Sequence, residues 1–216
     1  MKKELFFING FGGGLEDAIE IRSLLESEGY DFTYIDLPGH YSAKDVTVTD
    51  FEELLAYFEA FFPDHPIVLI GHAIGAEIAA YLSTRLTQIE SVIMLDGGII
   101  TNEDFNKTFQ ESIEETEQLF QSAELDDLDE ESLIELLKLN DAMKLTIARP
   151  DYDTPSLLLL SDFEDELAIK IQRLEKTNNP VLDYKVIPNA SHDIYADQPE
   201  QTVELIVEWL EKDLTL

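Results

Sequence analysis

Two glycines four residues apart, Gly71 and Gly75, directly follow an apolar run at residues 66–70. This spacing is typical of a Gly-x-Ser-x-Gly turn, in which a strand bends sharply into a helix and presents the middle side chain as a nucleophile. The middle residue here is Ala73, which has no oxygen or sulfur that could attack a carbonyl. The next N–H, that of Ile74, is the one that such a turn directs at a developing oxyanion. The sequence thus predicts the position of a nucleophile that is itself missing.

The elements that would place this turn are short apolar runs separated by amphipathic segments. We predict strands at residues 5–8, 32–35, 67–70, 92–95, 157–160 and 184–187. Residues 15–28, 50–62, 75–86, 164–175 and 199–212 carry apolar side chains at helical spacing. Such alternation predicts an α/β fold with a mainly parallel sheet and helices on both faces. Chemistry carried by loops then collects at the carboxyl ends of the strands.

One segment, residues 100–149, interrupts the alternation because it contains no strand signal. Between residues 111 and 135 it is rich in Asp and Glu, has no basic residue, and still carries apolar residues at helical spacing. We interpret the segment as a helical lid inserted into a single domain of residues 1–216. The alternative is a pair of ordinary surface helices with no gating role.

Length and composition are those of a globular protein. The chain has 216 residues, of which 44% are hydrophobic, and no cysteine, so it can form no disulfide and no thiolate metal site. None of the four histidines has the spacing of a metal-ligand set, and we expect no metal and no cofactor. Apolar runs are too short for a membrane span or a signal peptide, which leads us to expect a cytoplasmic protein.

The net charge restricts the partners. With 46 acidic and 14 basic residues, the formal charge is −32 at pH 7. A charge of this sign and size repels phosphate backbones and anionic lipid headgroups. We therefore exclude nucleic acid and membrane surfaces as partners.

Three motifs in chain order resemble those of the α/β-hydrolase family. Residues 9–13 (Asn-Gly-Phe-Gly-Gly) resemble its His-Gly-x-Gly-Gly turn, residues 36–40 (Asp-Leu-Pro-Gly-His) match its Asp-x-Pro-Gly-His turn, and residues 71–76 occupy the place of its nucleophile turn. The resemblance implies an oxyanion hole made by the backbone N–H groups of Phe11 and Ile74. It places Gly10 and Gly12 beside that hole.

The resemblance also implies a histidine base and an acid that orients it. His192 lies in the loop between the last predicted strand and the helix that starts at Pro199, where the family carries its histidine. In most relatives the acid follows the strand at 157–160, which here offers Glu164 or Asp165. In the thioesterase-like branch the acid follows the preceding strand, which offers Asp96. We favour Asp96, because it comes directly after its strand and two glycines follow it.

The function implied by the resemblance is that of a serine hydrolase for a small-molecule carboxylic ester or thioester, similar to esterases and type II thioesterases. With Ala73 at the nucleophile position, we expect this chain to be largely inactive. Either alanine has replaced a serine, or the chain is a natural pseudo-hydrolase that serves as an acyl-ligand or protein binding module. A carrier protein is a further possible partner in either case.

Overall fold

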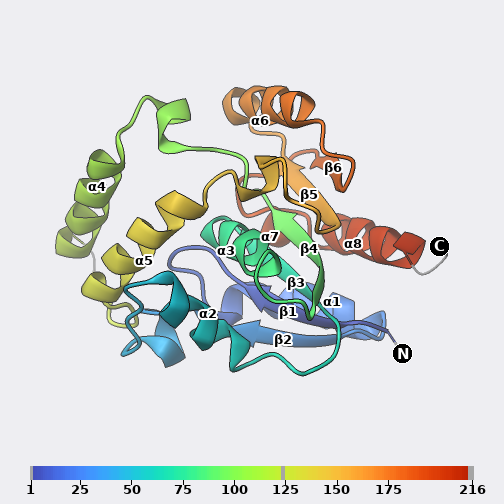
Figure 1. The fold of residues 1–216 in the computed structure, drawn as a ribbon, viewed down its shortest axis with the longest axis horizontal. Helices are drawn as coiled ribbons and strands as arrows, with labels where there is room; N and C mark the ends of the chain where they lie inside the picture. The colour runs from blue at the N-terminus through green and yellow to red at the C-terminus, as the bar shows by residue number, and fades with distance from the viewer. Residues whose placement is uncertain (1, 123–124, 214–216) are drawn as a thin grey trace.

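The fold is built on a parallel sheet, seen in a computed structural model that describes residues 2–122 and 125–213. Within these residues six strands pair in the order β2-β1-β3-β4-β5-β6, every pair parallel (Figure 1). The strands are β1 Glu4–Ile8, β2 Asp31–Ile35, β3 Ile67–His72, β4 Ile89–Leu95, β5 Ser156–Ser161 and β6 Leu182–Ile187. Each lies where the sequence predicts a strand, so the predicted α/β class is confirmed.

Helices cover both faces of the sheet, as predicted. One face carries α2 (Phe51–Glu59), α3 (Ile74–Ser83) and α6 (Glu164–Thr177), and the other carries α1 (Ile19–Ser27), α7 (Ile194–Asp197) and α8 (Pro199–Asp213). Successive side chains of a strand point to opposite faces. In β1, accordingly, Phe6 and Ile8 join the core under α2 and α3, whereas Leu5 and Phe7 join the core under α1 and α8. Burial on both faces explains why the strands are continuous apolar runs.

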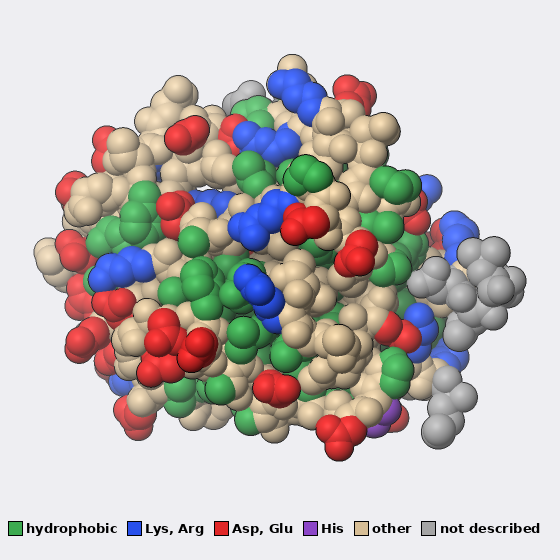
Figure 2. Space-filling model, in the orientation of Figure 1, with side chains coloured by type: hydrophobic (Ala, Val, Ile, Leu, Met, Phe, Trp, Pro, Cys, Tyr) green, Lys and Arg blue, Asp and Glu red, His purple; other side chains and the backbone are tan. Residues whose placement is uncertain are grey.

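The segment between β4 and β5 is helical in its described part. It contains α4 (Phe109–Ser122), α5 (Glu130–Met143) and the 3₁₀ turns Asn102–Phe105 and Thr146–Ala148. Helix α5 packs on α3 through buried residues that include Leu136 and Met143, and α4 lies outside α5 at the edge of the molecule (Figure 1). Acidic side chains are dense where these two helices reach the surface (Figure 2).

Two local features fix where the helices begin. Asp50 caps α2 by accepting hydrogen bonds from the backbone N–H groups of Glu52 and Glu53. Pro199 is the first residue of α8, where its missing N–H costs nothing. No helix of the described residues is long and apolar enough to cross a membrane.

Candidate active site

The turn between β3 and α3 has the strained geometry of a nucleophile turn. Ala73 adopts φ 50° and ψ −118°, a conformation that costs an L-residue about 1–3 kcal/mol. A Cβ on Gly71 would lie 2.2 Å from the carbonyl oxygen of Gly75, and one on Gly75 would lie 2.2 Å from that of Ile8. Only glycine fits at either position, so the turn holds the Ala73 side chain at the carboxyl end of the sheet.

An imidazole and a carboxylate meet at the same edge. The Nδ1–H of His192 donates to Oδ2 of Asp96 over 2.8 Å. Asp96 directly follows β4 and His192 lies in the loop after β6, and the carboxyl ends of parallel strands share one edge of a sheet. This tautomer leaves Nε2 of His192 free to accept a proton. The side chains of Glu164 and Asp165, the other predicted acids, lie outside the described residues.

The Asp96 carboxylate is fully enclosed and accepts three hydrogen bonds. Besides His192, the backbone N–H of Ser161 donates to it over 2.8 Å and Nζ of Lys170 over 2.9 Å. Burial raises the pKa of Asp96, but the hydrogen bond from His192 and the charge of Lys170 outweigh it and hold the pKa below its usual value. The hydrogen bond to Asp96 in turn raises the pKa of His192 against an opposing effect of burial.

Lys170 is a residue of the candidate site that the sequence analysis missed. Its side chain is buried, and Nζ also lies 3.2 Å from an oxygen of Glu166. A signal was present, because Lys170 comes three residues after Leu167 and four before Leu174 on the inward side of α6. A lysine at a core position of an amphipathic helix indicates a buried anion.

The glycine-rich turn after β1 lies against Ala73. A Cβ on Gly10 would come within 3.2 Å of the Ala73 Cβ. The N–H of Gly10 donates to Oδ1 of Asn9 over 2.7 Å, and the N–H of Gly12 donates to Nε2 of His40 over 3.0 Å. Both N–H groups therefore have partners within the turn and its neighbour His40, while Gly10 lies next to Ala73 as predicted for a residue beside the oxyanion hole.

The two remaining predicted donors are unoccupied. Neither the N–H of Phe11 nor that of Ile74 donates a hydrogen bond to another group of the described chain. Ile74 is the first residue of α3, where a helix leaves its N–H groups without internal partners. Ile74 directly follows Ala73, and Phe11 directly follows Gly10, on which a Cβ would lie 3.2 Å from the Ala73 Cβ. Donors of this kind suit the charge that develops on a carbonyl oxygen under attack.

Two buried histidines, His72 and His40, form hydrogen bonds that hold the loops of the site in place. The Nε2–H of His72 donates to the backbone carbonyl of His192 over 3.0 Å, and burial lowers the pKa of His72 to about 4. The Nδ1–H of His40 donates to the carbonyl of Pro38 over 3.0 Å, which leaves Nε2 to accept from Gly12. Burial lowers the pKa of His40 as well, so both rings are neutral at pH 7.

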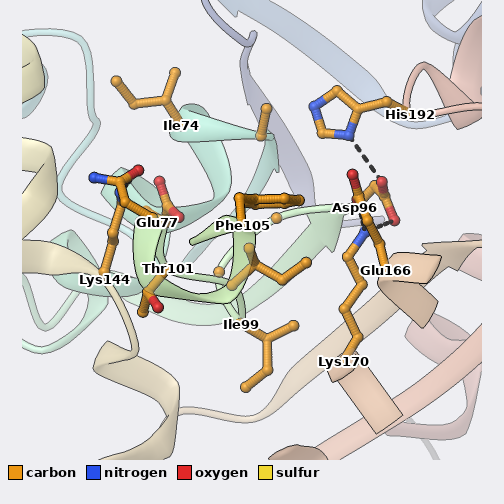
Figure 3. A pocket seen from close by; sticks show the side chains of 15 residues that line it. Ile74, Glu77, Asp96, Ile99, Thr101, Phe105, Lys144, Glu166, Lys170 and His192 are labelled. Atoms are coloured by element: carbon orange, nitrogen blue, oxygen red, sulfur yellow. Dashed lines mark hydrogen bonds and ion pairs between the residues drawn. The ribbon is translucent and has the colours of Figure 1, made fainter. Parts of the chain in front are cut away.

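A cavity of about 450 Å³ opens beside these groups. It is lined by Ala73, Asp96 and His192 and by apolar side chains that include Ile74, Ile99 and Phe105 (Figure 3). Within the described residues no group of three or more His, Asp or Glu side chains is arranged to hold a metal ion.

Comparison with known proteins identifies the class. Residues 4–152 match the family described as alpha/beta hydrolase fold, and the chain belongs to this family. It is similar to a Mycoplasma pneumoniae protein provisionally named esterase/lipase 1, with 26% identity over 254 aligned residues that cover 97% of this chain and 91% of the relative.

Solved structures share the fold at low sequence identity. MenH from S. aureus superposes with a TM-score of 0.76 at 15% identity, covering 99% of this chain and 95% of that one. The monoacylglycerol lipase of Paleococcus ferrophilus superposes with a TM-score of 0.70 at 16% identity, covering 96% and 93%.

Proposed function

We propose that this chain is the framework of a serine-type carboxylic ester hydrolase, with Ala73 at the position of the nucleophile. The observation that carries the proposal is the hydrogen-bonded pair of His192 and Asp96, which lines the same cavity as Ala73. The name of the Mycoplasma relative supports an ester as the substrate. A thioester would meet the same groups.

The proposed chemistry is acyl transfer to a hydroxyl at position 73. The hydroxyl oxygen attacks the carbonyl carbon while Nε2 of His192 takes its proton, and Asp96 stabilises the resulting imidazolium. The N–H groups of Phe11 and Ile74 hold the oxyanion. His192 then protonates the departing alcohol, and a water molecule attacks the acyl group in the second half of the cycle to release the carboxylic acid.

The methyl group of Ala73 cannot take part in this reaction. Loss of the nucleophile from such a triad costs on the order of 10⁶ in kcat, so we expect the chain to bind an ester and scarcely convert it. Water activated by His192 would leave a residual rate roughly 10³ to 10⁴ above the uncatalysed one.

We also propose that residues 100–149 act as a lid. Ile100, Asn102, Phe105 and Lys144 come from this segment and line the cavity. A segment that forms one wall of a pocket controls access when it moves.

Replacing Ala73 by serine tests the proposal. The rate of p-nitrophenyl butyrate hydrolysis is compared for the parent chain, Ala73→Ser, and Ala73→Ser combined with His192→Ala; a butyryl thioester forms a second series. We expect Ala73→Ser to gain at least 10³-fold and the second substitution to remove that gain. Equal rates in all three proteins for both substrates would overturn the proposal.

A natural acyl-binding module is the second candidate, and Ala73 itself favours it, because a protein that must retain its ligand has no use for a nucleophile. It predicts that Ala73→Ser stays inactive although the chain binds esters in equilibrium dialysis. An acidic carrier protein is a poor partner for either candidate, since like charges repel at a net charge of −32.

A further inference from the structure

One carboxylate of the cavity, that of Glu77, comes from a helix whose buried residues are otherwise apolar. Helix α3 is buried along its length from Ile74 to Leu82, and Glu77 is its one charged residue. The Glu77 residue is only 9% exposed and lines the cavity. In Figure 3 Glu77 and Lys144 lie on one side of the pocket, with Asp96, Lys170 and His192 on the other. Glu77 is therefore separate from the group that we assign to the reaction.

Protein contacts satisfy only half of this carboxylate. Its Oε2 accepts a hydrogen bond from Nδ2 of Asn140 over 2.7 Å. Its Oε1 has no hydrogen-bond partner among the described residues and is not sealed among protein atoms. The Oδ1 of Asn140 is buried without a partner. The fold thus accepts one unsatisfied amide oxygen in order to hold Glu77 in place, and such an oxygen is costly.

A cation stands beside the carboxylate at the same side of the pocket. Nζ of Lys144 donates to Oδ1 of Asn102 over 2.8 Å and lies 3.4 Å from Oδ1 of Asp141. An ammonium group has three donors, so one remains for a ligand. Burial raises the pKa of Glu77 to about 7, and Oε1 therefore both accepts and donates hydrogen bonds near neutral pH.

A structural role accounts poorly for this arrangement. Among the described residues Glu77 makes no ion pair within hydrogen-bonding distance. An apolar side chain would fill the same place in α3 without the cost of burying a carboxylate. Glu77 and Lys144 both line the cavity, and Oε1 of Glu77 and Nζ of Lys144 each keep unused hydrogen-bonding capacity. Glu77 and Lys144 together form a polar recess whose unused hydrogen-bonding groups could be satisfied by a bound ligand.

The chemistry of the recess selects the ligand group. A carboxylate or phosphate would be repelled by Glu77 and Asp141, which outnumber the one cation, and an ammonium group has no acceptor for a hydrogen bond from Lys144. A neutral hydroxyl accepts from Lys144 and pairs with Glu77 in either protonation state. We propose that Glu77 and Lys144 form a specificity subsite for a hydroxyl group on a neutral ester, on either the acyl or the alcohol side of the ester bond.

The spacing along α3 limits how far that hydroxyl is from the reacting carbonyl. Ala73 directly precedes α3 and Glu77 is the fourth residue of that helix, so about one turn of chain separates the two positions. This corresponds to a hydroxyl a few carbons away from the ester group. The inference deepens the proposed function, because it names a substrate class for the same cavity, but binding to the parent chain tests it without any turnover.

The test compares two matched pairs of neutral esters by titration calorimetry with the parent chain. Methyl 6-hydroxyhexanoate and methyl hexanoate place the hydroxyl on the acyl side, and 4-hydroxybutyl acetate and butyl acetate place it on the alcohol side. We expect the hydroxylated member of one pair to bind at least tenfold more tightly, and the pair that does so identifies the side. Equal affinity within each pair would overturn the proposal.

Variants assign the preference to the recess. Glu77→Leu should abolish the preference while the unsubstituted esters bind at least as well, and Lys144→Met should reduce it at least threefold. Glu131→Leu, at an exposed position of α5, is the matched control and should leave it unchanged. A hydroxyl preference that Lys144→Met leaves unchanged would contradict the proposal even if Glu77→Leu does not fold. If the parent chain prefers hydroxylated esters but Ala73→Ser is inactive, the proposed subsite stands and the proposed hydrolase function is rejected.

Discussion

Replacing Lys170 by methionine should destabilise the protein, because it leaves the buried carboxylate of Asp96 without its cation. The Nζ of Lys170 lies 2.9 Å from Oδ1 of Asp96, and the two side chains are 2% and 0% exposed. Removing one partner of a buried ion pair costs about 3–5 kcal/mol, because the other charge remains without compensation. Asp96 keeps the donors of Ser161 and His192, which places the expected loss near the lower end, at about 3 kcal/mol.

Urea unfolding followed by the fluorescence of Trp209 measures this loss. Trp209 is the only tryptophan and is largely buried, and its Nε1–H donates to Asp183 over 2.9 Å. The matched control is Lys176→Met, at an exposed position of the same helix, which should change the free energy of unfolding by less than about 0.5 kcal/mol.

A double-mutant cycle with Asp96→Asn isolates the pair. The combined variant should lose less than the sum of the single losses by at least about 1.5 kcal/mol, since neither charge is then left alone. A loss below about 1 kcal/mol for Lys170→Met, or strictly additive losses in the cycle, would refute the reasoning that a buried charge on Asp96 depends on Lys170.

Three further outcomes follow from the geometry. Ala73→Gly should stabilise the fold by about 1 kcal/mol in thermal unfolding, because glycine relieves the strain at φ 50°, and an unchanged melting temperature would argue against that strain. Burial raises the pKa of Glu77 from 4.5 to about 7, so the contribution of this side chain to stability is complete below pH 4.5 and is lost as the pH rises through 7. The parent should therefore lose about 3 kcal/mol of unfolding free energy relative to Glu77→Gln between pH 4 and pH 9, as measured by urea unfolding. In the Ala73→Ser background, kcat/KM should rise with pH through a His192 pKa above 6.5, because the hydrogen bond to Asp96 raises that pKa. Asp96→Asn should move this rise to lower pH and reduce the rate. A rise at the same pH in both proteins would show that Asp96 does not set the pKa of His192.

The sequence could predict the features that depend on local pattern. Runs of apolar residues placed the strands, and the pair Gly71 and Gly75 placed the turn around Ala73, because steric constraints on a strand-to-helix turn act within a few residues. The location of Asp96 directly after β4 was enough to bring it to the edge of the sheet where His192 also lies.

Features that depend on contacts between distant segments could not be predicted in the same way. Lys170 reaches Asp96 only because α6 and the residue after β4 lie close together in the fold. A helical pattern does not say which buried group lies opposite one of its positions. The N–H groups of Gly10 and Gly12 donate to Asn9 and His40, and the sequence of a turn does not reveal which of its donors are already used.

The account depends most directly on whether the cavity can activate a hydroxyl at position 73. Intact-mass spectrometry after treatment with an alkyl fluorophosphonate, which forms a covalent adduct with activated serine side chains, measures this for Ala73→Ser. We predict one adduct per chain at position 73, and none in the parent chain or in Ala73→Ser combined with His192→Ala. A folded Ala73→Ser protein that remains unmodified, or one that is modified equally without His192, would contradict the central claim.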